Sequence, residues 1–197
     1  MALPVEFLRA ITPEAINALA IRRYEGEVRL VETPADLERA AADFAVERVV
    51  GFDTETRPAF RPGERYPPAL AQVATGRAVY LIQLARVDAS AVLAALLGSA
   101  TVKAGVGLAD DVRALRQRFD FAPAAMVDLG AVARRHGIER SGVRALAALF
   151  LGTRIPKGAK TSNWAAPRLT PAQVAYAATD AWACRELYLR FAALRLL

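Results

Sequence analysis

The sequence has very little of the residues that build disulfides, zinc sites and membrane spans. Its 197 residues include one cysteine, Cys184, and one histidine, His136, which excludes an internal disulfide and leaves no Cys/His zinc site. No apolar run approaches the roughly 18 residues that a membrane helix needs, and the N-terminus lacks the basic and apolar segments of a signal peptide. These absences predict a protein of the reducing cytoplasm with no membrane association.

Lysine is scarce too, although the chain is basic. The 26 basic residues exceed the 20 acidic ones and give a net charge of +6, yet the only lysines are Lys103, Lys157 and Lys160. An excess of positive charge attracts polyanions, nucleic acid before anionic membranes. Nucleic acid is therefore the first partner to consider.

The length of the chain suits one domain with an appendage, and we expect a helical extension at residues 1–27 and one α/β domain at residues 28–197. The strand-like runs are "EVRLVE" (27–32), "RVVGFDTE" (48–55), "ALAQVAT" (69–75), "AVYLIQL" (78–84) and "TVKAGVG" (101–107). The middle three follow in quick succession, as in an antiparallel meander, while a helix before the last favours a parallel crossover. The result is a mixed sheet flanked by helices. Two long irregular loops, 57–68 and 152–170, are predicted beside it.

Two acids follow a buried strand in the stretch "VVGFDTETRP", residues 49–58. Side chains alternate along a strand, so Asp53 and Glu55 point to one side and Thr54 to the other. Two carboxylates on one face repel each other and are costly to take out of water without a partner. The stretch is either a strand end that frays into solvent or half of a divalent-metal site.

A third acid interrupts the apolar side of the last helix. Tyr176, Asp180, Cys184 and Leu187 recur at spacings of three and four, which place them on one helical stripe. An ionised Asp180 among apolar side chains needs a positive partner, which an arginine or a metal ion could supply. Tyr176 precedes Asp180 by one turn, so its hydroxyl can share the same pocket.

Two neighbouring acids occur in "VKAGVGLADDVRALRQRF", residues 102–119. The apolar stripe of this helix includes Leu108 and Leu115. At about 100° per residue, Asp111 falls on the flank of the stripe and Asp110 faces solvent. We therefore expect Asp111 at a cleft and Asp110 as a first-turn acid that favours the helix dipole.

Three segments together resemble the exonuclease motifs of DEDDy-type 3′–5′ exonucleases. They are "GFDTET", "AGVGLADDVRAL" and "YAATDAW", in that order. The resemblance extends over roughly residues 28–195 and points to the ribonuclease D group and the exonuclease domain of the Werner syndrome helicase. It implies a ribonuclease-H-like fold, with a mixed five-stranded sheet and helices on both faces. It also implies metal-dependent hydrolysis of phosphodiester bonds from the 3′ end of DNA or RNA.

The resemblance assigns roles to five residues. It implies that Asp53 contacts both of two divalent ions, Mg²⁺ or Mn²⁺, and that Glu55 and Asp180 bind the ion on the nucleophile side. It implies that Asp111 binds the ion on the leaving-group side and that Tyr176 orients the attacking water. The physical account agrees, since two ions held by oxygen ligands can neutralise charge on both the attacking and the leaving oxygen.

Six further residues are expected to contact the substrate. They are Thr54, Gln72, Lys157, Lys160, Asn163 and Trp164. The first two lie near the acids in the sequence and are expected to line the cleft. The other four lie in the basic, aromatic loop 152–170, which could grip the strand or stack on its bases. For Trp164, packing in the core is an equally good interpretation.

Two other function classes were weighed against an exonuclease. A catalytically weak or inactive nucleic-acid-binding module of the same fold would be expected to lack at least one acid, and none is missing. A basic RNA-binding domain with incidental acids does not account for Asp180 in an apolar stripe. Ribonuclease D relatives carry helical domains after the catalytic one, and this chain ends at Leu197. We therefore expect the protein to act either on short or frayed ends or together with a protein partner that recruits the substrate.

Overall fold

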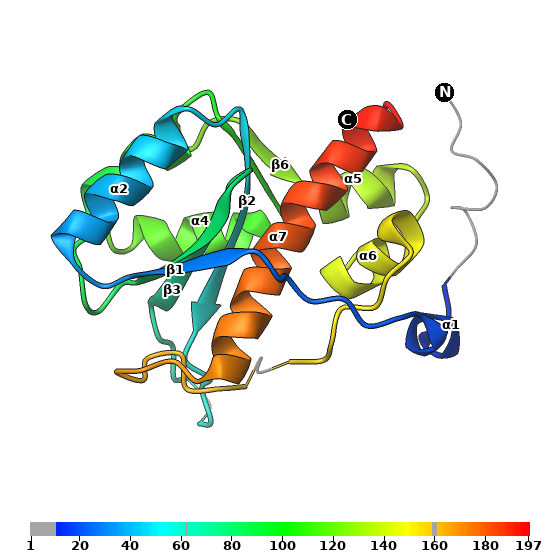
Figure 1. The fold of residues 1–197 in the computed structure, drawn as a ribbon, viewed down its shortest axis with the longest axis horizontal. Helices are drawn as coiled ribbons and strands as arrows, with labels where there is room; N and C mark the ends of the chain where they lie inside the picture. Colours follow the sequence, from blue (N-terminus) through cyan, green and yellow to red (C-terminus); the bar gives the residue numbers. More distant parts are fainter. Residues whose placement is uncertain (1–10, 62, 159–160) are drawn as a thin grey trace.

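A mixed sheet between helices organises the part of the chain that the computed structural model describes, residues 11–61, 63–158 and 161–197 (Figure 1). The strands are β1 (Glu27–Val31), β2 (Val49–Thr56), β3 (Pro68–Ala74), β4 (Ala78–Gln83), β5 (Val102–Gly105) and β6 (Met126–Asp128). The helices are α1 (Pro13–Ala18), α2 (Pro34–Ala45), α3 (Ser90–Gly98), α4 (Leu108–Arg116), α5 (Leu129–Arg135), α6 (Val143–Leu151) and α7 (Pro171–Ala193). This confirms the α/β class with a mixed sheet.

The strand directions confirm the predicted meander and crossover. β2 pairs antiparallel with β3, and β3 antiparallel with β4, whereas β5 lies parallel to β2. The order β1-β4-β3-β2-β5-β6 has six strands, so the expected count of five was wrong. The additional strand, β6, has only three residues. It is defined by its parallel pairing with β5, and so short a run carries no periodicity that the sequence could reveal.

The two faces of the sheet pack against different helices. Val50 and Phe52 of β2 are buried in one apolar cluster with side chains of α2, α3 and α4. On the other face, Leu70 of β3 and Leu81 of β4 pack against Ala177 of α7. The alternation of side chains along β2 therefore directs residues 51, 53 and 55 toward α7.

A glycine allows α7 to lie directly on β2. A Cβ atom at Gly51 would overlap the carbonyl oxygen of Ala181, so any other residue would push the helix away from the strand. Gly51 lies two residues before Asp53, and Ala181 directly follows Asp180. The close contact therefore brings the acids of β2 and α7 together.

Threonine caps, each directly before a proline, set the start of α1, α2 and α7. Thr170 accepts a hydrogen bond from the backbone of Gln173, and the Gln173 side chain returns the bond to the cap, which begins α7 at Pro171. Thr33 caps α2 in the same way with Asp36. Among the described helices, even the 23-residue α7 is not apolar enough to cross a membrane.

Candidate metal centre

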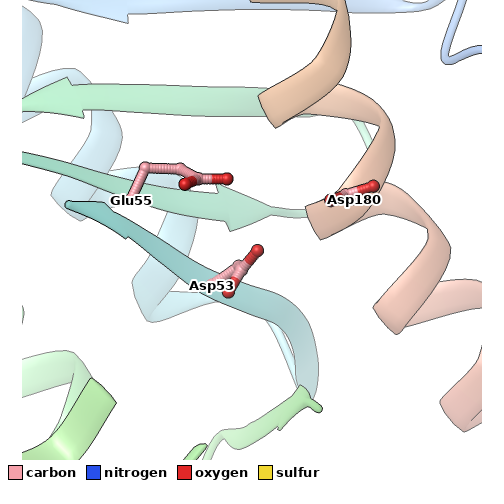
Figure 2. A group of neighbouring side chains, drawn as sticks. All are labelled: Asp53, Glu55 and Asp180. Carbon is pink, nitrogen blue, oxygen red and sulfur yellow. The ribbon is translucent and has the colours of Figure 1, made fainter. Parts of the chain in front are cut away.

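Three carboxylates from β2 and α7 lie together where β2 ends (Figure 2). Asp53, Glu55 and Asp180 each offer an oxygen, and these three oxygens lie within 4.8 Å of one another. Two of the acids come from one strand and the third from a helix far along the chain. Clustered carboxylate oxygens are the ligands that Mg²⁺ and Mn²⁺ prefer.

Burial and mutual repulsion make this group costly without a cation. Asp180 is only 5% exposed, and its Oδ1 has no hydrogen-bond partner among the described residues. Burial raises the pKa of Asp53 well above its ordinary value, and the charges of Asp111, Asp180 and Glu55 raise it further. Burial also raises the pKa of Asp180 to about 6, against the opposing effect of a hydrogen bond with Tyr176. A divalent cation would relieve these costs, so the donor set fits a metal.

The arginine alternative for Asp180 finds no support in the ion pairs. Within the described residues, the arginines that pair with acids contact Glu27, Glu32, Asp36, Asp43, Glu47, Asp110 and Glu186. Asp180 is absent from that set. A buried carboxylate with an unpaired oxygen and no salt bridge is better explained by a cation that binds there.

Asp111 lies beside this group rather than within it. It belongs to the first turn of α4, and its carboxylate accepts a hydrogen bond from the Thr54 hydroxyl. Burial raises the pKa of Asp111 to about 6, and its charge in turn raises the pKa of Asp53. The neighbouring Asp110 is 83% exposed and pairs with Arg113 at 2.8 Å. The two acids thus lie as the helical geometry predicts, and we call Asp53, Glu55, Asp111 and Asp180 the metal centre.

The start of α4 is held by an acid that the sequence analysis missed. Gly107 caps this helix with a φ of 80°, a left-handed conformation that favours glycine. Its backbone N–H donates to Asp128 at 3.1 Å, and Asp128 also accepts the N–H of Ala131 at the start of α5. Asp128, at the end of β6, therefore holds the start of α4, and the first turn of α4 contains Asp111. An aspartate directly before a helix was the available signal.

Tyr176 lies one turn before Asp180 and packs against the 152–170 loop. Its ring centroid is 6.0 Å from that of Trp164, with the two planes tilted by 38°. A Cβ atom at Gly158 would overlap the Tyr176 ring, so the loop backbone touches it directly. Burial, followed by the charge of Asp180, raises the pKa of Tyr176 far above its ordinary value. The hydroxyl therefore stays protonated and can donate a hydrogen bond near the metal centre.

Two of the expected substrate contacts are fully buried instead. Trp164 has no exposed surface, so its side chain does not stack on a substrate and the packing interpretation holds. Gln72 is equally buried, and it lies opposite Asp53 in the β2–β3 ladder. Neither its amide nitrogen nor its amide oxygen has a hydrogen-bond partner among the described residues. Gln72 was expected to line the cleft, because the polarity of a side chain does not by itself reveal its burial.

The other four expected substrate contacts have different surroundings. Lys157 and Asn163 are exposed on the 152–170 loop. Asn163 also has a local role, because its side chain accepts the backbone N–H of Ala165 at 3.2 Å. Thr54 is partly buried and directs its hydroxyl to Asp111. Lys160 lies outside the described residues.

The loop after β2 also carries basic and aromatic side chains next to the centre. Arg57 lies over the ring of Tyr66, 4.6 Å from its centroid, and Phe60 is 78% exposed. Arginines interleaved with aromatic residues are typical of surfaces that bind single strands. This signal was present in "RPAFRPGERYPP", which the sequence analysis assigned only as an irregular loop.

Comparisons with known proteins agree with this geometry. The profile of a family described as 3′–5′ exonuclease matches residues 28–194. The chain is 35% identical over 143 residues to ribonuclease D of Haemophilus influenzae. The matched region covers 71% of this chain and 35% of that protein. It is 33% identical over 147 residues to the mouse bifunctional 3′–5′ exonuclease/ATP-dependent helicase WRN, covering 71% of this chain and 10% of that protein.

A solved structure supports the fold. The Aedes aegypti Nibbler EXO domain superposes with a TM-score of 0.77 at 24% identity, covering 90% of this chain and 94% of that one. This likeness concerns the fold alone. The chain spans about a third of the ribonuclease D relative and a tenth of the helicase.

Proposed function

Because the chain belongs to the family of 3′–5′ exonucleases, we propose that it removes nucleotides one at a time from the 3′ end of RNA. The observation that carries this proposal is the meeting of Asp53, Glu55 and Asp180 within 4.8 Å at the end of β2. All four acids of the metal centre are in place, so nothing favours an inactive binding module.

The metal centre suits two divalent cations, Mg²⁺ or Mn²⁺. Asp53, Glu55 and Asp180 would hold one, and Asp53 with Asp111 would hold the second. When bound, such ions activate water near neutral pH and neutralise charge on the leaving oxygen. The protein's own contribution is to aim the water, and Tyr176 is the group that can do so, because its protonated hydroxyl lies one turn from Asp180.

RNA is proposed as the substrate because a curated relative is a ribonuclease D. The net charge of +6 supports a polyanionic partner of either kind. The single, buried Cys184 is compatible with a reducing compartment, and we propose the cytoplasm.

The test is digestion of matched strands labelled at the 3′ end: single-stranded RNA, single-stranded DNA and a recessed duplex, each with Mg²⁺ or Mn²⁺. Wild-type protein should release labelled mononucleotides at once from RNA, and EDTA should stop the reaction. Asp53→Asn should release none under the same conditions. Internal cuts, or digestion that persists in EDTA, would contradict the proposal, and faster release from DNA would reassign the substrate.

A further inference from the structure

A basic hollow of about 370 Å³ lies between α4 and the described residues that follow β2. The lining residues that matter here are Thr56, Arg57, Arg65, Tyr66, Asp110 and Arg113. Three arginines therefore face a space that contains a single carboxylate. We call this hollow the arginine pocket.

One residue of backbone separates the arginine pocket from the metal centre on β2 and on α4. Thr56 directly follows Glu55 on β2, and Asp110 directly precedes Asp111 on α4. Neighbouring Cα atoms are about 3.8 Å apart, so the rim of the pocket begins one residue from two acids of the centre. The pocket borders the centre where α4 supplies Asp111.

The positive charge in the pocket is only partly compensated. Arg113 pairs with Asp110 at 2.8 Å, but both side chains are largely exposed, 72% and 83%, so this pair contributes little. Arg57 contacts the ring of Tyr66 rather than an acid. Arg65 has no hydrogen-bond or ion-pair partner among the described residues. Three guanidinium groups gathered around a concavity with one acid match an anion, and phosphate accepts their paired N–H donors.

The chemistry of a 3′ end decides which phosphate this can be. When the last phosphodiester bond of a strand is cut, the leaving nucleotide ends in a free 3′ hydroxyl and carries no phosphate beyond the scissile one. Every other phosphate of the strand lies on the 5′ side. We propose that the arginine pocket binds a backbone phosphate of the substrate strand on the 5′ side of the scissile bond. This inference rests on the proposed exonuclease function and specifies how that site holds its strand.

Binding measured without catalysis tests the pocket independently of hydrolysis. A labelled RNA decamer is titrated in EDTA, at several salt concentrations, with wild-type protein, with Arg57→Ala/Arg65→Ala and with Arg116→Ala. Arg116 is exposed on the same helix but does not line the pocket, so it is the matched control. The double variant should bind about tenfold more weakly and lower the salt slope by about two, one for each arginine removed. Arg116→Ala should change both much less.

Hydrolysis of substrates of two lengths gives the second readout. A dinucleotide without a 5′ phosphate has only the scissile phosphate, whereas a decamer can also fill the pocket. The ratio of kcat/KM for decamer over dinucleotide should fall about tenfold in the double variant and stay at the wild-type value in Arg116→Ala. If wild-type protein digests both but the double variant matches the control in affinity, salt slope and ratio, the pocket proposal is overturned. If wild-type protein digests neither, the exonuclease proposal fails, while the binding titration still decides whether the pocket holds a strand.

Discussion

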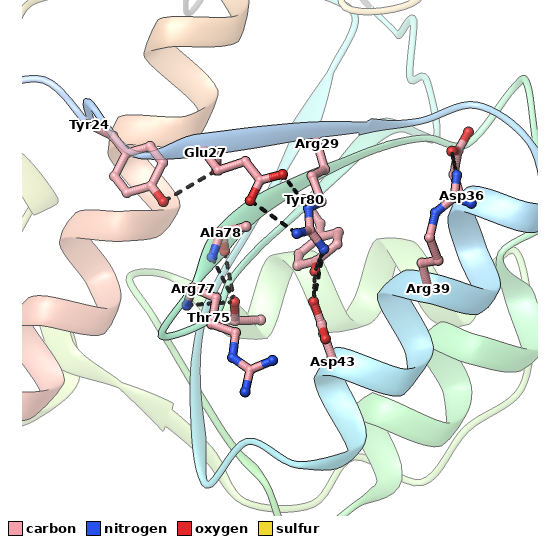
Figure 3. Close-up of polar contacts among 10 residues, drawn as sticks. All are labelled: Tyr24, Glu27, Arg29, Asp36, Arg39, Asp43, Thr75, Arg77, Ala78 and Tyr80. Atoms are coloured by element: carbon pink, nitrogen blue, oxygen red, sulfur yellow. Dashed lines mark hydrogen bonds and ion pairs between the residues drawn. The ribbon is translucent and has the colours of Figure 1, made fainter.

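Glu27 and Asp43 lie where β1, α2 and β4 meet, and Arg29 contacts both of them (Figure 3). Arg29 donates to Glu27 at 2.8 Å, to Asp43 at 3.0 Å and to the Tyr80 hydroxyl at 2.8 Å, and Tyr80 in turn donates to Asp43. At the end of β2, Asp180 forms no such salt bridge among the described residues, and Arg144 acts on it only as a nearby charge, which lowers its pKa against the larger effect of burial. There, Asp180 keeps a buried oxygen without a partner.

The difference separates acids that support the fold from acids that await a ligand. Arg29 and Glu27 of this network are in contact with solvent, which weakens their ion pair, while Asp43 and Tyr80 are partly or fully buried. In the metal centre, burial raises the pKa values of Asp53, Asp111 and Asp180, which means that folding works against their charge. A carboxylate that is costly to keep in the fold points to function rather than to stability.

The largest effect should come from exchanging one acid in each region. Asp53→Asn removes a charged ligand from the metal centre and should lower kcat/KM more than about 10³-fold, because metal catalysis contributes several kcal/mol. Asp43→Asn should keep hydrolysis near the wild-type rate while lowering the melting temperature by a few degrees. The measurements are single-strand digestion and calorimetry. Equal losses of activity in the two variants would remove the distinction between the regions.

Next in size is the contrast between two adjacent acids of α4. Asp111→Asn should reduce hydrolysis by about 10²-fold or more, since it removes a ligand of the centre. Asp110→Asn, which changes an exposed partner of Arg113, should stay within about threefold of wild type. Steady-state kinetics on one RNA substrate compares them. The reverse order would mean that Asp110, not Asp111, belongs to the centre.

Tyr176 and Tyr80 each form a hydrogen bond with an acid, and loss of the hydroxyl should affect turnover in the first and stability in the second. Tyr176→Phe keeps the ring packed against Trp164 but deletes the hydroxyl, so turnover should fall by about 10- to 100-fold while Mn²⁺ affinity changes little. Tyr80→Phe deletes a hydroxyl of the Arg29 network and should affect stability alone, by about 1 kcal/mol. Kinetics paired with calorimetric Mn²⁺ titration separates the roles. Loss of Mn²⁺ binding in Tyr176→Phe would show that the hydroxyl supports the ligands rather than the water.

A smaller effect is expected from Thr54, whose hydroxyl donates to Asp111. Thr54→Val keeps the shape but leaves Asp111 without this donor, and should weaken Mn²⁺ binding and turnover by about tenfold. Thr54→Ser retains the hydroxyl and should restore most of both. A Thr54→Ser variant as impaired as Thr54→Val would indicate that the methyl group, not the hydrogen bond, matters.

The pH dependence of stability should have opposite signs in the two regions. The folded state raises the pKa values of Asp111 and Asp180 to about 6, so it binds more protons than the unfolded chain between about pH 4 and 6 and loses stability as pH rises through that window. Glu27 behaves conversely, because Arg29 lowers its pKa, so the stability that ionised Glu27 contributes is lost as pH falls.

Thermal unfolding of the metal-free wild-type protein in EDTA tests this sign. Its midpoint temperature should decline between about pH 4.5 and 7, and Asp53→Asn should make this decline smaller. Saturating Mn²⁺ should raise the midpoint at pH 7 by a few degrees, and a rising midpoint in EDTA would contradict the assignment.

Short-range rules accounted for much of the fold and the centre. The alternation along β2 placed Asp53 and Glu55 on one side, the helical period separated Asp111 from Asp110, and Thr170 marked the start of α7. Each rule acts within a strand or a turn or two of helix, where neighbouring residues decide the geometry. The family resemblance added the branch and the roles.

The sequence by itself therefore determined where the acids, the helix caps and the periodic apolar positions lie. Tertiary packing decided which of these residues come into contact. Gln72 was expected to line the cleft and is buried, and the packing interpretation of Trp164 holds because it is buried in the cluster that β3 and β4 form with α7. Thr54 and Asp111 bond across 57 residues, and Gly51 matters only because Ala181 lies on it. Burial and unpaired charge are properties of how the layers stack, and no local pattern encodes the distance between β2 and α7.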